Sequence, residues 1–179
     1  MIRTKKDLKD YLNADLKSHN LDGWNIVKSI RYPIMDFQWR LRNTEYIVNN
    51  SRGKLSKIRK GIALYRLRRS GIKLGFTIPP NVFGPGLCIV HWGTLVVNPK
   101  ARIGANCRIH PGTTIGATDE GVPQIGDDAY IGPGARLFGP IVLGDRVVIA
   151  ANAVVNKSYG SDCTLAGVPA KQIIRRLAR

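Results

Sequence analysis

The chain has 179 residues, with 28 Lys and Arg against 12 Asp and Glu, which gives a formal net charge of +16. Apolar residues make up 44% of it, so a packed core is expected and disorder throughout is excluded. No apolar run reaches the roughly 18 residues of a membrane-spanning helix. The first residues are not typical of a secretory signal.

Three cysteines, Cys88, Cys107 and Cys163, lie far apart in the sequence and form no C-x-x-C pair. This spacing argues against a disulfide scaffold and against a four-ligand zinc site. We therefore expect a cytoplasmic protein and no metal.

Charge and glycine content divide the chain near residue 75. Residues 1–75 carry a net charge of +12, whereas residues 76–179 carry +4 and hold 14 of the 19 glycines. We expect an N-terminal basic helical segment (1–75), a central domain (76–165) and a C-terminal basic tail (166–179).

The N-terminal segment is predicted to be a small helical bundle. Thr4 and Asp7 can cap a first helix whose apolar residues fall on one stripe. A second amphipathic helix is indicated around residues 55–65, and Gly71 is expected to end it.

The central domain has a six-residue period. An aliphatic residue recurs at that interval, often followed by Gly or Ala, in two runs: Val97, Ile103, Ile109, Ile115, and Ile125, Ile131, Leu137, Leu143, Ile149, Val155. Neither a helix (period 3.6) nor an ordinary strand (period 2) explains this interval. A parallel β-helix does, with three short strands per coil, each aliphatic residue pointing inward and the small residue permitting a tight turn.

Three blocks of sequence resemble one family. The segments Gly86-Leu-Cys-Ile-Val-His91-Trp-Gly-Thr, Ile109-His110-Pro-Gly-Thr-Thr-Ile-Gly116 and Ala166-Gly-Val-Pro-Ala-Lys171 are similar to serine acetyltransferases, which have a left-handed parallel β-helix of hexapeptide repeats. The likeness covers roughly residues 75–175. The N-terminal segment is similar to short family members found in surface-polysaccharide biosynthesis.

The resemblance implies an acetyl-CoA-dependent O-acetyltransferase that works as a homotrimer or a dimer of trimers. His91 occupies the position of the family's catalytic histidine, and Gly116, Ala117, Pro133, Ala151 and Lys171 match positions that contact the cofactor. An imidazole base that accepts the hydroxyl proton during direct attack contributes about 10²–10⁴ to the rate. Such a mechanism needs no acyl-enzyme, so Cys88 and Cys107 need no nucleophilic role.

Counting three repeats per coil places candidate residues on one edge. Ile89, Ile109, Ile131 and Ile149 should stack on the same face, about 4.8 Å apart. His91 and His110 then lie on adjacent coils of one edge, above a column of small residues that a pantetheine chain can follow. His110 is the second catalytic candidate. A break in the period at residues 116–124 predicts a projecting loop with Asp119 and Glu120, which can orient His91 in place of a missing carboxylate.

Three positions depart from the family pattern. Val90 stands where an Asp usually precedes the catalytic histidine, Thr77 stands near the place of an upstream Asp, and Val122 takes the place of a second histidine. Because those groups help to recognise the amino acid, we expect a sugar hydroxyl as acceptor. Serine is the alternative, and a non-catalytic basic β-helix that binds other molecules is the second alternative.

Residues 52–73 contain nine Lys or Arg and no acidic residue, interleaved with an apolar stripe. Such a helix can lie on an anionic membrane surface or bind phosphate groups, and it can also be a solvated face without a partner. Nucleic acid is disfavoured as a partner, because most of the excess charge lies outside the periodic domain.

Overall fold

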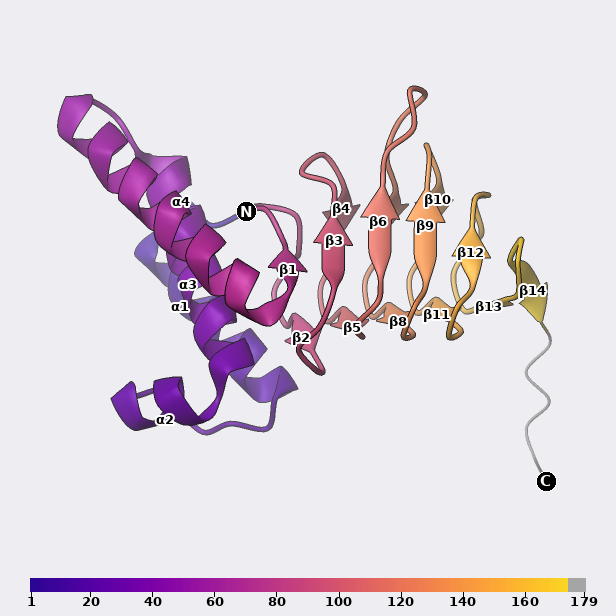
Figure 1. The fold of residues 1–179 in the computed structure, drawn as a ribbon, viewed down its shortest axis with the longest axis horizontal. Helices are drawn as coiled ribbons and strands as arrows, with labels where there is room; N and C mark the ends of the chain where they lie inside the picture. The colour runs from indigo at the N-terminus through magenta and orange to yellow at the C-terminus, as the bar shows by residue number, and fades with distance from the viewer. Residues whose placement is uncertain (174–179) are drawn as a thin grey trace.

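A computed structural model of the chain describes residues 1–173. It has two parts, a group of four helices and a parallel β-helix that extends away from them (Figure 1). The helices are α1 (Lys5–Ser18), α2 (Ile26–Arg31), α3 (Pro33–Asn50) and α4 (Lys54–Leu74). No helix among residues 1–173 is both long enough and apolar enough to cross a membrane. The prediction of a helical N-terminal segment is confirmed.

The first helix begins at the predicted cap. The Thr4 Oγ1 accepts the Asp7 N–H (3.0 Å), and the Asp7 carboxylate accepts the Thr4 N–H (2.9 Å), which completes a capping box. The prediction that Gly71 ends the last helix is wrong. The helix continues to Leu74 and ends at Gly75, which adopts the left-handed conformation (φ 82°). Gly71 instead lies where the helix meets β1. A Cβ there would lie 2.6 Å from the Phe76 carbonyl oxygen, so the close approach of β1 favours glycine at this position.

The β-helix has three faces, each a sheet that gains one strand per coil. Face A contains β1 (Phe76–Thr77), β3 (Leu95–Val97), β6 (Thr114–Gly116), β9 (Arg136–Phe138) and β12 (Val154–Val155). Face B contains β4 (Arg102–Ile103), β7 (Gln124–Ile125) and β10 (Val142–Leu143). Face C contains β2 (Cys88–Ile89), β5 (Arg108–Ile109), β8 (Tyr130–Ile131), β11 (Val148–Ile149), β13 (Thr164–Ala166) and β14 (Lys171–Ile173).

The six-residue period predicted both burial and register. Every aliphatic residue of the two predicted runs is buried, with at most 6% of its surface exposed. Ile89 pairs with Ile109, Ile109 with Ile131 and Ile131 with Ile149, so the predicted stacking of one face is confirmed. Among the strands of residues 1–173, only β14 runs antiparallel to its neighbour, which ends the regular coil. The C-terminal tail predicted for residues 166–179 therefore begins within the β-helix, and its residues 174–179 lie outside the described part.

The small residues after the aliphatic positions have a different cause from the predicted one. Gly132 has no positive φ. A Cβ at this position would instead lie 2.7 Å from the Ile149 carbonyl oxygen and 2.8 Å from the Ala151 nitrogen. The close approach of the next coil therefore requires glycine here. Positive φ angles occur two residues later, at Gly134 (73°), and at the equivalent Gly112 of the preceding coil (80°).

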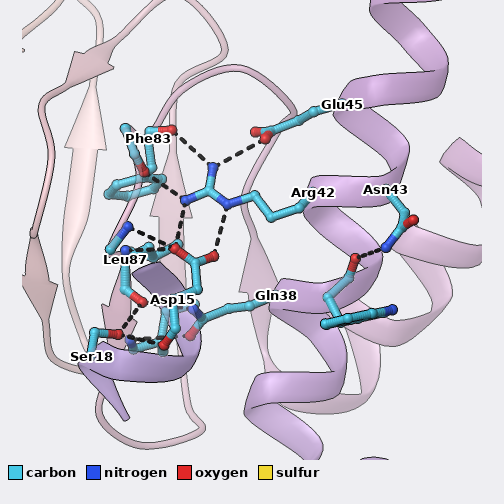
Figure 2. Close-up of polar contacts among 12 residues, drawn as sticks. Asp15, Ser18, Gln38, Arg42, Asn43, Glu45, Phe83 and Leu87 are labelled. Atoms are coloured by element: carbon cyan, nitrogen blue, oxygen red, sulfur yellow. Dashed lines mark hydrogen bonds and ion pairs between the residues drawn. The ribbon is translucent and has the colours of Figure 1, made fainter. Parts of the chain in front are cut away.

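Buried polar side chains join the helices to the first coil (Figure 2). The Arg42 guanidinium on α3 donates to both Asp15 carboxylate oxygens and to the carbonyl oxygens of Phe83 and Gly84. It also donates to the Glu45 carboxylate (3.1 Å). Gln38 donates to the Leu87 carbonyl (2.7 Å). These bonds satisfy backbone carbonyl groups in the segment before β2, which lies outside any strand. The helices therefore close the N-terminal end of the β-helix.

Candidate active site

The two histidines of the central domain lie where the chain turns from face C to face A. His91 follows β2 and His110 follows β5, so they occupy adjacent coils on one edge. The backbone ladder continues into this edge, with the Val90 N–H donating to the Ile109 carbonyl (3.1 Å) and the His110 N–H donating to the Ile131 carbonyl (3.1 Å). The edge is therefore held by the same hydrogen bonds as the strands.

His91 is exposed, and its backbone is anchored against α4. Two residues later, the Gly93 N–H donates to the Leu74 carbonyl (2.9 Å). A Cβ on Gly75 would lie 2.9 Å from the Gly93 carbonyl carbon, so the helix end and this turn are in direct contact. The candidate base therefore presents an accessible ring from a turn that the helical segment supports.

His110 is half-buried, and its Nε2 atom is shielded from solvent without a hydrogen-bond partner among residues 1–173. Its ring lies against the Tyr130 ring, with centroids 5.1 Å apart. Burial lowers the pKa of His110 below its ordinary value, and electrostatic interactions with Arg108 and with the His91 imidazole lower it further. His110 is therefore mainly neutral at pH 7, with its Nε2 atom unpartnered among the described residues.

The same edge continues along the β-helix through small residues. The pairing register aligns Val90, His110, Gly132, Ala150 and Ala166 in one column. Pro133 and Ala151 come directly after Gly132 and Ala150, and both are exposed. Lys171, also exposed, pairs with Ala166 at the far end of face C. Five of the seven predicted site residues thus follow one edge, over roughly 24 Å for five strand spacings.

The other two predicted residues lie on a different edge. Gly116 ends β6 and Ala117 follows it, so both lie where the chain turns from face A to face B. The Phe138 ring covers Gly116, because a Cβ there would lie 2.5 Å from a ring carbon. The width of face A separates these residues from His91 within one chain.

The predicted loop projects from this second edge. Thr118 and Gly121 exchange two backbone hydrogen bonds of 2.9 and 3.2 Å, which close a tight turn with Asp119 and Glu120 at its exposed tip. Figure 1 shows it as the longest excursion from the β-helix, beyond β6. Within one chain, the two carboxylates leave from the edge opposite His91.

Two further residues of the histidine edge were not predicted. The Thr113 hydroxyl is buried and donates to the His110 carbonyl (2.8 Å), which fixes the turn below the ring. Trp92, next to His91, exposes 66% of its surface. The Trp next to the candidate base was visible in the sequence, whereas its exposure was not, and nothing in the sequence distinguished Thr113 from other threonines.

The buried cysteines are not arranged as nucleophiles. Burial raises the pKa of the Cys107 thiol far above its ordinary value, and burial likewise raises the pKa of Cys88. Neither thiol is therefore poised as a thiolate nucleophile. Among residues 1–173, no group of three or more His, Cys, Asp or Glu side chains is arranged to hold a metal ion.

Comparison with known proteins places this fold and edge in context. The family model "Bacterial transferase hexapeptide (six repeats)" matches residues 123–157. The serine acetyltransferase of Synechococcus elongatus is 33% identical over 111 residues, covering 59% of this chain and 46% of that protein. The enzyme of Staphylococcus epidermidis strain RP62A is 30% identical over 145 residues, covering 77% and 62%.

Solved structures agree over more of the chain. Neisseria gonorrhoeae serine acetyltransferase superposes with a TM-score of 0.77 at 27% identity, covering 98% of this chain and 70% of that one. A serine acetyltransferase in complex with CoA superposes with a TM-score of 0.76 at 26% identity, covering 94% and 71%.

The repeats and the three-faced coil define a left-handed β-helix of the hexapeptide-repeat class. Within that class the chain is serine acetyltransferase-like, since sequence relatives and superposed structures agree. It spans about half the length of the curated relatives that it matches first, with 46% and 52% covered.

Proposed function

We propose that this protein transfers the acetyl group of acetyl-CoA to the hydroxyl of L-serine, with His91 as the general base. The observation that carries the proposal is the exposed His91 at the turn before face A, in a chain whose superposed neighbours are serine acetyltransferases. One of those neighbours is described as a complex with CoA and another as a complex with serine.

The chemistry follows from an accessible imidazole. His91 accepts the proton of the serine hydroxyl while the oxygen attacks the thioester carbonyl. Backbone N–H groups stabilise the oxyanion. The C–S bond then breaks, and the proton on His91 passes to the leaving sulfur, which gives O-acetylserine and CoA. No acyl-enzyme forms, which agrees with thiols whose pKa burial raises.

The small residues of the histidine edge support a binding path for acetyl-CoA. Gly132, Ala150 and Ala151 add little side-chain volume beside the turn, and Lys171 at the end of the edge offers a positive charge for a phosphate. We assign the pantetheine chain to this edge.

A homotrimer completes the site in this proposal. His91 lies at one end of the face A strands, and Gly116 and Ala117 lie at the other. A neighbouring copy related by a threefold axis can bring its Gly116 edge and its projecting loop to the His91 edge. Asp119 or Glu120 of that copy then orients His91, in place of the upstream carboxylate that is missing near Thr77.

The acceptor is tested directly. Release of CoA thiol is measured with L-serine and with a panel of monosaccharides and oligosaccharides, using wild type, His91→Ala and the surface control Val142→Ala. We expect turnover with serine, a loss of about 10²–10⁴ in His91→Ala and no change in the control. Turnover with sugars and not with serine would instead support a sugar hydroxyl as acceptor, as the departures at Val90, Thr77 and Val122 predict. Turnover with neither would overturn the proposal.

The shared site has its own test. His91→Ala and Ala117→Trp are each expected to be inactive as pure oligomers. Mixed oligomers of the two variants then recover part of the activity, since some interfaces combine two intact edges. Failure of mixed oligomers of trimer mass to recover any activity would show that each chain forms its site alone.

A further inference from the structure

One side of α4 presents apolar residues to solvent. Its exposed apolar side chains have 49% to 85% of their surface accessible and recur at three- and four-residue spacing or multiples of it: Leu55, Ile58, Ile62, Tyr65 and Ile72. Residues at such spacing share one side of a helix. Leu67 and Gly71, on the opposite side, are buried against α3 and β1. The stripe is therefore separate from the side of α4 that packs on the protein.

Basic side chains flank this stripe on both sides, and Arg69 lies within it, four residues after Tyr65 and three before Ile72. Arg59, Arg66 and Lys73 recur every seven residues along one flank, and Lys57 and Arg68 lie along the other. Among residues 1–173, none of the nine basic residues of the segment 52–73 forms an ion pair. The flanking charges are thus available to an anionic partner.

A basic pocket of about 470 Å³ opens beside the stripe, between α3 and α4. It is lined by four cationic side chains, Arg40, Arg66, Arg69 and Lys73, and by the single carboxylate of Asp36. Arg40 already pairs with that carboxylate at 2.7 Å. Tyr65 belongs to both the stripe and the pocket wall. The excess positive charge of the pocket suits a phosphate group beside the C-terminal half of the apolar stripe.

We propose that α4 is a membrane-docking helix, which lies in the interface of an anionic bilayer with its apolar stripe inserted and a lipid phosphate in the basic pocket. Apolar insertion and attraction to anionic headgroups together determine the affinity of such helices. This inference goes beyond the proposed acetyl transfer and does not depend on it.

Charge and apolarity together favour a bilayer over other occupants. Two copies of the face would bring eighteen unpaired positive charges together, since each segment carries nine and no acidic residue. Nucleic acid would satisfy the charge, but phosphate contacts do not bury a row of Leu and Ile side chains. Only a lipid surface uses both features at once.

The test is flotation of the full-length protein with phosphatidylcholine vesicles, with and without phosphatidylglycerol. We expect binding to the anionic vesicles that weakens as salt rises. The triple variant Arg66→Glu, Arg69→Glu, Lys73→Glu should bind at least roughly 100-fold more weakly, at about fivefold for each basic residue removed. The charge-matched control Lys100→Glu, Arg102→Glu, Lys157→Glu changes exposed residues of the β-helix and should retain binding.

The apolar stripe is tested separately. Ile58→Ser with Ile62→Ser should weaken vesicle binding by roughly 10-fold or more, whereas Val142→Ser on face B should not. Circular dichroism checks that each variant is folded. Absence of binding to anionic vesicles at low salt, or unchanged binding by the stripe variant, would overturn the proposal. A stripe variant that lowered the oligomer mass without weakening vesicle binding would show that a second copy of the chain covers the stripe. RNA binding that is tighter than vesicle binding and independent of the stripe would likewise overturn the proposal.

Discussion

Arg42 and Asp15 form an ion pair in which both side chains are fully shielded from solvent. The guanidinium Nε lies 2.8 Å from one carboxylate oxygen, and Nη2 lies 3.2 Å from the other. Asp15 also accepts the N–H groups of Gly86 and Leu87, both at 2.9 Å. Burial alone would lower the pKa of Arg42, but the carboxylates of Asp15 and Glu45 outweigh it and raise that pKa, so Arg42 stays charged. The pair connects α1, α3 and the first coil.

Removing the cation should be costly. Arg42→Met keeps the apolar stem but leaves the Asp15 and Glu45 carboxylates buried without their partner. We expect a loss of about 3–5 kcal/mol in the free energy of unfolding, measured by urea denaturation. Arg40→Met is the matched control, because it breaks a partly exposed pair with Asp36 and should cost at most about 0.5 kcal/mol. Equal losses of unfolding free energy in the two variants would contradict a stabilising role of the buried Arg42 between the helices and the first coil.

Glycine substitutions test the close approach between coils. In Gly132→Ala the new methyl group meets backbone atoms of the next coil at 2.7 and 2.8 Å, and we expect a loss of about 1–3 kcal/mol. Gly160→Ala is the control, since a Cβ at Gly160 would meet no atom within 4 Å and its φ is not positive. Thermal unfolding of both variants measures the difference. A stable Gly132→Ala variant would show that the coils can move apart.

The β-helix was predictable because its period is a direct consequence of its geometry. Each inward position recurs at a fixed interval, so burial, register and the shared edge of His91 and His110 followed from counting. The division of the cofactor residues between two edges also follows from that count. Gly116 follows its aliphatic residue on face A, whereas Pro133 and Ala151 follow residues of face C.

The contacts that join the helices to the first coil, and the side of α4 that faces solvent, were not predictable in the same way. Arg42 meets a partner 27 residues away, and Asp15 meets Gly86 71 residues away, with no repeating pattern to connect them. Helical spacing in α4 locates a stripe but does not state whether it faces the core or solvent. Only the packing of Leu67 and Gly71 shows that Ile58 and Ile62 face outward.

The capping box of α1 should make the folding stability of the protein depend on pH in the acidic range. The Arg3 N–H lowers the pKa of Asp7 below its ordinary value of 3.8, and hydrogen bonds with the Thr4 backbone and side chain add to the effect. The stabilisation is therefore present above pH 3.8 and is lost as pH falls through the lowered pKa. Asp7→Asn should destabilise the protein at pH 6 and have little effect at strongly acidic pH, by urea denaturation. Asp10→Asn removes the same charge without those bonds and should match wild type at both. Thr4→Ala should cost about 1 kcal/mol.

The environment of His110 predicts an unusual titration. Burial first, then electrostatic interactions with Arg108 and with the His91 imidazole, lower its pKa below 6.5. The unfolded chain therefore takes up this proton at a higher pH than the folded protein does. The contribution to stability is complete above pH 6.5 and is lost as pH falls toward the lowered pKa. In an NMR titration of imidazole Cε1–H resonances, Arg108→Gln should raise the pKa of His110. Arg136→Gln, on face A, is the matched control and should not change it. Equal shifts in both variants would mean that overall charge, and not the neighbouring guanidinium, determines the titration of His110.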